Sequence, residues 1–376
     1  MRIAVNTRLL IAGKMDGIGW YTYETLRRIV TAHPEHEFYF LFDRRPNEIF
    51  IFASNVRAVV VNPPARHPVL WWLFFEIGVP KALKKYNIDL FLSPDGYIPL
   101  HSSVPTVDVI HDINFAHFSN NLRRSHQWYM SHYFPKFAKR ATRVVTVSEF
   151  SKSDIAKTYC VAQDKISVIY NGAGDKYHPV SNDEKILIRK KYTEEKPYFI
   201  FISTILRRKN LTNLLKAYNR YREITGDSQK LIVVGARVWW GDELKRAYEE
   251  MHYREDVLFL GHTEAEELSR LLAAATALVY PSFFEGFGIP IVEAFNTDTP
   301  VITSNKTSMP EVAGDAALLI DPNDVEGIVE AMRRVADDGD LRQRLIERGR
   351  ERRKLFTWDE AAVKLWEIMI QTYRNA

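Results

Sequence analysis

Short apolar segments alternate with helical segments along nearly the whole chain, and this alternation constrains the fold more than any other feature. In the first half, the apolar segments are Arg2–Asn6, Glu37–Phe42, Val56–Val61, Asp89–Ser93, Thr106–Ile110 and Arg143–Val147. In the second half, they are Tyr198–Ser203, Lys230–Val234, Val257–Leu260, Ala277–Tyr280, Pro300–Thr303 and Ala317–Ile320. Apolar residues recur at helical spacing in Trp20–Ala32, Ser125–Ala141, Leu211–Ile224 and Glu264–Ala275. This pattern favours parallel sheets covered on both faces, and it predicts two doubly wound α/β domains.

The boundary between the two domains is predicted within residues 171–195. Asn171 and two nearby glycines are turn residues, and the polar stretch that follows them has no apolar period. The last segment, Trp358–Tyr373, has apolar residues at helical spacing, and we expect this helix to pack back on the first domain. The predicted domains are therefore residues 1–175, residues 176–357 and a C-terminal helix over residues 358–376.

Charge and cysteine content exclude several classes of function. The formal net charge of the 376 residues is only +4, which is too balanced for a nucleic-acid-binding protein. The single cysteine, Cys160, excludes an intramolecular disulfide framework and a cysteine-based zinc finger, and it fits a reducing cytoplasm. No metal-ligand spacing such as HExxH occurs, so we expect no metal site. The first residues resemble a strand and lack the apolar core of a signal peptide.

The most apolar stretch, Pro68–Val79, raises the question of membrane contact. At about 12 residues it is too short to span a bilayer, which needs about 20. We favour a packed helix of the first domain around Trp71 over a patch that touches lipid. Residues 1–175 carry 21 Lys and Arg against 15 Asp and Glu, a net charge of +6. This excess is either ordinary scatter or a basic surface that meets an anionic membrane.

The segment PSFFEGFGIPIVEAF, residues 281–295, carries the most specific chemical signal. It follows a predicted strand, and Pro290 suits the first turn of a helix. Gly286 and Gly288 let backbone amides approach a ligand, and the positive end of the helix dipole favours an anion there. Glu285 and Glu293 flank this turn, and carboxylates accept hydrogen bonds from sugar hydroxyls.

Other polar residues follow the ends of predicted strands. Arg208 and Lys209 are two cations that could neutralise a diphosphate leaving group. His111 ends a strand of the first domain, at the sheet edge where open α/β sheets bind ligands. Gly17 and Gly19 are predicted in a loop before a helix that begins near Trp20. The third glycine of a dinucleotide fingerprint is missing there, which argues against an oxidoreductase.

Together these motifs resemble the retaining glycosyltransferases of family 4, and the resemblance covers nearly the whole chain. Residues 281–295 are similar to the paired-glutamate motif of that family. Other similar segments, in chain order, are DGIGWYTYETL, VIHD, VTVSEFSKSDIA, VIYNG, ISTILRRKNLTNLL, SNKTSMPEVAGDAALLIDP and FTWDEAA. The resemblance implies the GT-B fold, in which two Rossmann-like domains face each other across a cleft, with residues 1–175 on the acceptor side and residues 176–357 binding the nucleotide sugar. In that fold the C-terminal helix crosses back to the first domain.

The resemblance also implies roles for these residues. Glu285, His111, Lys209 and Arg208 would be the catalytic residues, and Gly17, Gly19, Phe287, Gly288, Ile289 and Glu293 would bind the donor. Within this set, Glu293 would accept hydrogen bonds from the nucleotide ribose and Glu285 would lie against the donor sugar. The two cations would act on the diphosphate without a metal, so no cofactor is expected besides the nucleotide-sugar co-substrate.

The donor and acceptor are expected from the same resemblance. STILRRKN is similar to the GTLEPRKN pattern of bacterial mannosyltransferases, although Ser203 replaces its glycine and Leu206–Arg207 its Glu-Pro. We therefore favour GDP-mannose as donor and a glycan or lipid-linked saccharide of a surface polysaccharide, such as lipopolysaccharide, as acceptor. The enzyme would be cytoplasmic, at the inner face of the cytoplasmic membrane. The alternatives are a nucleotide-sugar 2-epimerase of the same fold and a non-catalytic protein that binds sugar nucleotides.

Overall fold

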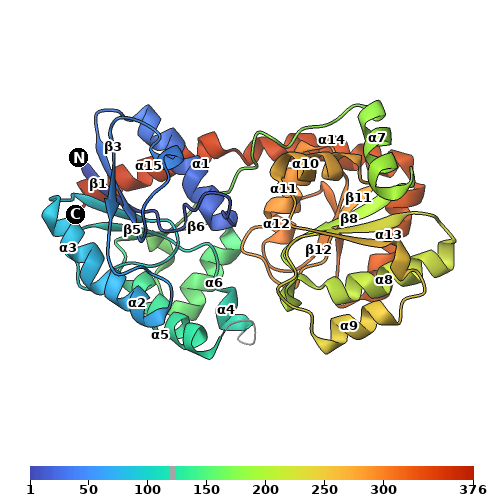
Figure 1. Cartoon of the computed structure of the whole chain (residues 1–376), viewed down its shortest axis with the longest axis horizontal. Coiled ribbons are helices and arrows are strands. Elements are labelled where there is room, and N and C mark those ends of the chain that lie inside the picture. The colour runs from blue at the N-terminus through green and yellow to red at the C-terminus, as the bar shows by residue number, and fades with distance from the viewer. Residues whose placement is uncertain (119–122) are drawn as a thin grey trace. The chain divides into compact units, whose positions relative to one another are not determined.

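The computed structural model describes residues 1–118 and 123–376, and the chain forms two compact units (Figure 1). Unit 1 comprises Met1–Asn171 together with Thr357–Ala376, and unit 2 comprises Gly172–Phe356. The first boundary therefore falls at residue 171, where the sequence predicts 175, and the chain enters unit 1 a second time at its C-terminal end.

Unit 1 is built on a seven-stranded parallel sheet with the order β3-β2-β1-β4-β5-β6-β7. Its strands are β1 (Arg2–Asn6), β2 (Glu37–Phe42), β3 (Val56–Val60), β4 (Leu90–Ser93), β5 (Thr106–Val109), β6 (Arg143–Thr146) and β7 (Ile166–Val168). Its α-helices are α1 (Gly17–Ala32), α2 (Pro68–Leu73), α3 (Val79–Lys85), α4 (Asn114–His117), α5 (Arg124–Arg140), α6 (Glu149–Tyr159) and α15 (Trp358–Arg374). A π-helical turn, Phe74–Gly78, joins α2 to α3.

Two apolar layers cover the faces of this sheet, because successive strand side chains point to opposite sides. Ala4 of β1 belongs to the layer under α2, α3 and α5, whereas Ile3 and Val5 belong to the layer under α1 and α15. Helix α15 packs on α1: the Tyr21 and Trp358 ring centroids are 6.0 Å apart, and Arg28 Nε donates to Asp359 at 2.5 Å. The expectation that the last helix returns to the first domain is confirmed.

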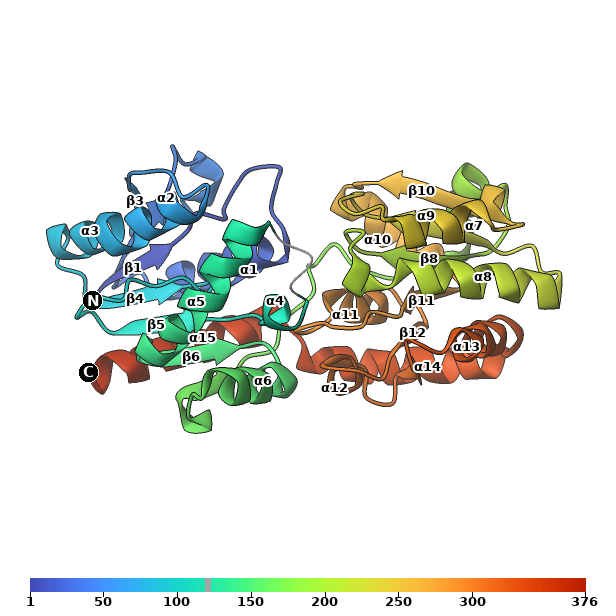
Figure 2. The ribbon, with the colours of Figure 1, turned by 90° about the horizontal axis from the view of Figure 1, so that it is seen from below.

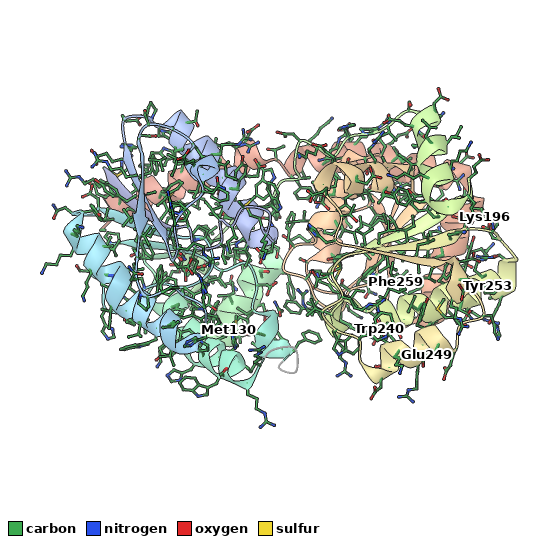
Figure 3. All side chains as sticks on the ribbon, viewed as in Figure 1. Met130, Lys196, Trp240, Glu249, Tyr253 and Phe259 are labelled. Carbon is green, nitrogen blue, oxygen red and sulfur yellow. The ribbon has the colours of Figure 1, made fainter. Side chains whose placement is uncertain are left out.

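Unit 2 is built on a six-stranded parallel sheet with the order β10-β9-β8-β11-β12-β13, and helices lie on both faces (Figure 2). Its strands are β8 (Tyr198–Ile202), β9 (Lys230–Val234), β10 (Val257–Gly261), β11 (Ala277–Tyr280), β12 (Val301–Ser304) and β13 (Ala317–Ile320). Its α-helices are α7 (Asn182–Thr193), α8 (Leu211–Thr225), α9 (Asp242–Glu249), α10 (Ala265–Ala274), α11 (Ile289–Asn296), α12 (Met309–Ala313), α13 (Val325–Asp337) and α14 (Gly339–Arg352). Trp240 and Phe259, with ring centroids 5.6 Å apart, pack beside its core (Figure 3).

The predicted boundary region, residues 171–195, contains helix α7, which the Ser181 hydroxyl caps by accepting from Glu184 N. Only Ile188 and Thr193 of that helix are buried, so its apolar period is weak. Helix α1 begins at Gly17 rather than near Trp20, since Asp16 Oδ1 accepts from Gly19 N at 3.0 Å and caps the helix there.

The Trp71 region is a packed helix, as favoured, with one outward face. The Trp71 ring is buried and its Nε1 donates to Ala65 O at 2.9 Å, and Phe74 and Phe75 are buried beside it. Trp72, on the other side of the helix, is 40% exposed. Among the described residues, no helix is both long and apolar enough to cross a membrane.

Each sheet has a point where the strand order reverses direction. In unit 1 this point lies between β1 and β4, and in unit 2 it lies between β8 and β11. In open α/β sheets, ligands bind beyond the carboxyl ends of the strands at such switch points, because the neighbouring connections run to opposite faces and leave a crevice. Both edges are therefore candidate binding sites.

Candidate active site

Two loops meet at the carboxyl edge of unit 2, beside its switch point. One follows β8 and contains a 3₁₀ turn over Arg207–Lys209; the other follows β11 and contains the predicted glutamate motif. Phe283 N donates to Arg208 O at 2.8 Å, and Asn210 Nδ2 donates to Pro281 O at 3.0 Å. These bonds hold the two loops together, so residues from distant parts of the sequence share one site.

Glu285 is the centre of this site. Its Oε1 accepts from Lys209 Nζ at 2.5 Å and from the Tyr280 hydroxyl at 2.7 Å, and its Oε2 accepts from Arg208 Nη1 at 3.2 Å. Burial disfavours a charged carboxyl, but the Lys209 and Arg208 cations outweigh it and lower the pKa of Glu285 to about 2. Glu285 is therefore ionised at every physiological pH and cannot supply a proton.

The structure brings together three of the four predicted catalytic residues. Lys209 is 8% exposed and Glu285 6% exposed, so the cluster is an almost buried group of two cations and one anion. Sequence reasoning placed both cations on a diphosphate and did not predict that they pair with Glu285. It also missed Tyr280, whose hydroxyl lies 3.0 Å from Lys209 Nζ. Arg207, the third cation of the turn, is exposed.

Hydrogen bonds from Ser308 hold the backbone that follows Glu285. Ser308 Oγ donates to Glu285 O at 2.9 Å and to Phe287 O at 3.0 Å. Gly288 has a φ of +103°, and a Cβ there would lie 3.1 Å from Ile291 Cδ1, so this position requires glycine. Helix α11 then begins at Ile289; Pro290 has no amide hydrogen, and Ile291 N donates to Gly288 O at 2.9 Å. The predicted donor-binding residues 287–289 thus form a positive helix start.

Glu293 lies in the second turn of α11 and has a different environment. Burial raises the pKa of its half-buried carboxyl to about 7, although a hydrogen bond from the Tyr177 hydroxyl opposes this shift. Tyr177 precedes α7 in the polar stretch of the predicted domain boundary, and no spacing in the sequence pointed to it. At neutral pH Glu293 therefore exchanges between a neutral and a charged acceptor.

The remaining predicted residues belong to unit 1. His111 Nε2 donates to Pro94 O at 2.9 Å, and its ring meets the Tyr21 ring edge-on at 4.8 Å. Burial lowers the pKa of His111, so the ring is neutral; since a carbonyl only accepts, Nδ1 is the acceptor nitrogen. Gly17 is exposed and Gly19 is buried in the first turn of α1. A Cβ on Gly19 would lie 3.1 Å from Leu9 O.

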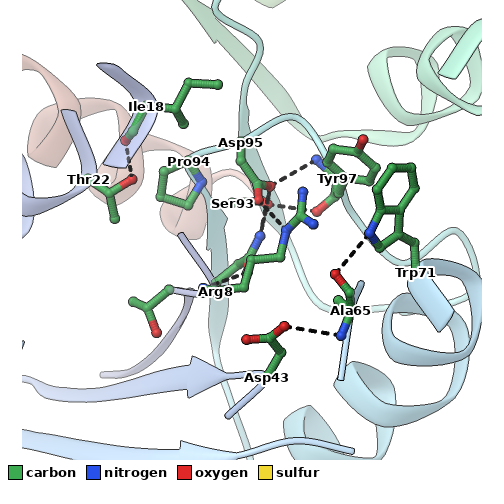
Figure 4. Close-up of polar contacts among 12 residues, drawn as sticks. Arg8, Ile18, Thr22, Asp43, Ala65, Trp71, Ser93, Pro94, Asp95 and Tyr97 are labelled. Carbon is green, nitrogen blue, oxygen red and sulfur yellow. Dashed lines mark hydrogen bonds and ion pairs between the residues drawn. The ribbon is translucent and has the colours of Figure 1, made fainter. Parts of the chain in front are cut away.

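Sequence reasoning missed a buried ion pair at the same edge of unit 1 (Figure 4). Arg8 Nε donates to Asp95 Oδ2 at 2.5 Å, and both side chains are nearly inaccessible to solvent. Arg8 and Asp95 each follow a predicted strand by two residues, which is the only sequence signal they carry. Across the described residues, no group of three or more His, Cys, Asp or Glu side chains could hold a metal ion.

Comparison with known proteins identifies the family. Residues 15–174 match the model for Glycosyltransferase Family 4, and residues 183–352 match the model for Glycosyl transferases group 1. The chain is 34% identical to O-antigen chain mannosyltransferase B of Escherichia coli over 362 residues, which cover 93% of this chain and 94% of that protein. This chain belongs to glycosyltransferase family 4. The resemblance found in its motifs is confirmed.

Two further similarities place this family 4 glycosyltransferase among known proteins. It is 31% identical to the O-antigen chain mannosyltransferase RfbU of Salmonella typhimurium over 71% of each chain. Its structure superposes on that of sucrose-phosphate synthase from Thermosynechococcus elongatus with a TM-score of 0.79 and 18% identity, over 100% of both chains. The predicted GT-B class, with two Rossmann-like domains, is confirmed.

Proposed function

We propose that this glycosyltransferase moves a mannosyl group from GDP-mannose to a hydroxyl of a glycan or lipid-linked saccharide, with retention of configuration and without a metal. The observation that carries this proposal is the buried Glu285–Lys209–Arg208 cluster at the carboxyl edge of unit 2. Two relatives named O-antigen mannosyltransferases support mannose as the sugar.

The cluster suits departure of a nucleoside diphosphate. When the bond between sugar C1 and the phosphate oxygen breaks, negative charge grows on the diphosphate. Lys209, Arg208 and the positive end of the α11 dipole would stabilise this charge in the transition state more than in the ground state. Glu285, always ionised, would bind hydroxyls of the sugar and oppose the positive charge that develops at C1.

Transfer on one face of the sugar needs no protein nucleophile. The acceptor oxygen bonds to C1 on the side from which the diphosphate leaves, and the leaving phosphate oxygen takes the acceptor's proton. Neither step requires a proton from Glu285, which agrees with its low pKa. On unit 2, the Glu293 carboxyl would accept hydrogen bonds from the ribose hydroxyls.

Thermal stabilisation by a panel of nucleotide sugars tests the donor. At 100 times its dissociation constant, a donor should add about 2.7 kcal/mol of stability. We expect the largest shift with GDP-mannose, smaller shifts with UDP- and ADP-hexoses, and loss of the shift in Glu293→Ala. Glu330→Ala, an exposed glutamate on α13, is the matched control and should keep the full shift. No shift with any donor would contradict the proposed function.

We also propose that unit 1 contacts an anionic membrane through the α2–α5 surface. This surface consists of exposed Arg66, Val69, Trp72, Arg123, Arg124 and Trp128. Helices α2 and α5 are adjacent, since the Trp71 ring lies 5.4 Å from that of Tyr129. Indole rings among cations suit the headgroup region of a bilayer that contains anionic lipid.

Sedimentation with vesicles tests this contact separately from catalysis. The protein should bind vesicles that contain phosphatidylglycerol and not vesicles of phosphatidylcholine alone. The double variant Trp72→Ser/Trp128→Ser should lose most of this binding, whereas Trp20→Ser should keep it. Trp20 is 40% exposed, like Trp72, but belongs to α1 on the other face of the sheet. Equal binding by all three proteins would refute the contact.

A further inference from the structure

Arg8 lies at the switch point of the unit 1 sheet, the position at which open α/β sheets bind ligands. It follows β1, and its partner Asp95 follows β4, the neighbouring strand on the other side of the reversal. The ion pair therefore spans the two strands between which the order changes. Nothing in the proposed donor chemistry uses this pair.

The pair is held rigidly from several sides (Figure 4). Asp95 Oδ1 accepts from Asn6 Nδ2 at 2.7 Å and from Ser93 Oγ at 3.2 Å, so its orientation is fixed. The guanidinium of Arg8 lies 4.3 Å from the ring centroid of Tyr97, and the Phe75 and Trp71 rings are within 6 Å as well. A planar cation stacked on an aromatic ring loses little further freedom when it binds a ligand.

The Arg8–Asp95 ion pair would contribute little to folding stability if that were its only role. A buried ion pair is often no more stable than apolar side chains of the same volume, because both charges lose their hydration. Nε of Arg8 donates to Asp95 and the guanidinium also hydrogen-bonds to Tyr97, which leaves further Nη hydrogens for other acceptors. The Arg8 side chain keeps 9% of its surface exposed.

Charge balance indicates the class of ligand. Arg8 is neutralised by Asp95, and Asp43, at the end of β2, is neutralised by Arg44 through bonds of 2.6 and 3.0 Å. A phosphate would gain little from so balanced a site, whereas a saccharide ring offers hydroxyls that both donate and accept. The carbonyl of Pro94, in the same loop as Asp95, accepts from the neutral His111 imidazole. One loop therefore holds both the Arg8–Asp95 ion pair and His111.

We propose that Arg8, oriented by Asp95, binds hydroxyls of the acceptor saccharide and is a specificity-determining residue of this glycosyltransferase. This inference rests on the proposed function, because it assumes that the acceptor is a neutral sugar. Unit 1 thereby contributes a preformed polar contact for the acceptor, formed by residues that the family motifs in the sequence do not mark.

Saturation-transfer NMR with methyl α-D-mannopyranoside tests the inference. The wild-type protein should transfer saturation to this glycoside. Arg8→Lys keeps the charge beside Asp95 but loses the planar fork, and it should weaken binding by about tenfold or more. The matched control is Arg222→Lys in unit 2, because Arg222 is also 8% exposed, pairs with Asp256 at 2.7 Å and lies 4.6 Å from the Tyr253 ring centroid. That variant should bind the glycoside normally.

Several results would overturn the inference: no transfer to the wild-type protein, unchanged transfer in Arg8→Lys, or loss of transfer in Glu293→Ala, which would locate the sugar in unit 2. Displacement of the glycoside by inorganic phosphate would also overturn it, since the site would then prefer an anion. GDP-mannose stabilisation, measured on the same variants, should persist in Arg8→Lys. Its absence in every protein would instead contradict the proposed function, so the two failures are distinguishable.

Discussion

Glu285 and Glu293 are eight residues apart in one motif, yet their surroundings shift their pKa values in opposite directions. Two cations lower the pKa of Glu285 to about 2, whereas burial raises that of Glu293 to about 7 against the opposing hydrogen bond from Tyr177. One carboxyl is therefore permanently charged, and the other titrates in the physiological range. The roles that we propose for them follow from this difference.

Glu285→Gln should slow sugar transfer by about 10²–10³-fold, because an uncharged amide cannot oppose positive charge at C1 or orient Lys209 and Arg208. Stabilisation by GDP-mannose should be retained, since the cations remain. Initial rates with a radiolabelled donor would measure the effect. Wild-type-like transfer by this variant would refute the role of Glu285.

Donor binding should strengthen as pH rises through about 7, because ionised Glu293 is the better acceptor for ribose hydroxyls. In Glu293→Gln this pH dependence should disappear. In Tyr177→Phe it should move to higher pH, since the hydrogen bond that lowers the carboxyl pKa is lost. Calorimetric titrations at a series of pH values would decide, and a flat profile in the wild-type protein would contradict the assignment.

The buried carboxyl of Asp108 leads to a prediction about the stability of unit 1. It is fully buried in β5, neither carboxyl oxygen has a hydrogen-bond partner among the described residues, and burial raises its pKa well above the ordinary value. The unfolded chain releases this proton near pH 3.9, so unit 1 should lose stability as pH rises from there toward the folded pKa. Asp108→Val should add about 1–3 kcal/mol at neutral pH in urea unfolding. A destabilised variant would show that the carboxyl has a partner.

At the scale of elements, the C-terminal helix decides how unit 1 is completed. Trp358 of α15 is almost fully buried against Tyr21, and Leu365 and Met369 continue the same face. Because β1, β4 and β5 leave apolar residues on this side of the sheet, the helix covers a surface that α1 alone does not.

Trp358→Ala should therefore destabilise unit 1 by about 3–5 kcal/mol, the usual cost of removing a buried Trp side chain. Val363→Ala, at an exposed position of the same helix, should change stability by no more than about 0.5 kcal/mol. Urea unfolding followed by circular dichroism would compare the two. Similar effects of both substitutions would mean that the helix does not pack as described.

The sequence predicts helices and strands well where an apolar pattern has the period and the length of a buried element. Every strand it predicts exists within one residue at each end, because strands buried on both faces are continuously apolar. Strand β7 is only three residues long and α7 buries only Ile188 and Thr193, so neither has a periodic signal. In the site, Glu285, Arg208 and Lys209 were found because they lie in local motifs. Tyr177, Tyr280 and Arg8 were not, since only tertiary packing brings them to their partners.

At the scale of the whole molecule, the chain is two Rossmann-like units, of which unit 1 is discontinuous in sequence. Its residues come from both ends of the chain, and unit 2 is one uninterrupted segment between them. The proposed donor residues Glu285 and Glu293 belong to unit 2, and the proposed acceptor residue Arg8 belongs to unit 1.

The return of residues 357–376 to unit 1 sets an order of synthesis and folding. A ribosome makes the chain from its N-terminal end, so unit 2 is complete before the last helix of unit 1 has emerged. Unit 2, though second in the sequence, should reach its stable form first. Pulse proteolysis of stalled nascent chains would show protection of residues 172–356 before that of residues 1–171. Quality control in the cell would then act mainly on unfinished unit 1, and truncations near the C-terminus would be degraded through their N-terminal half.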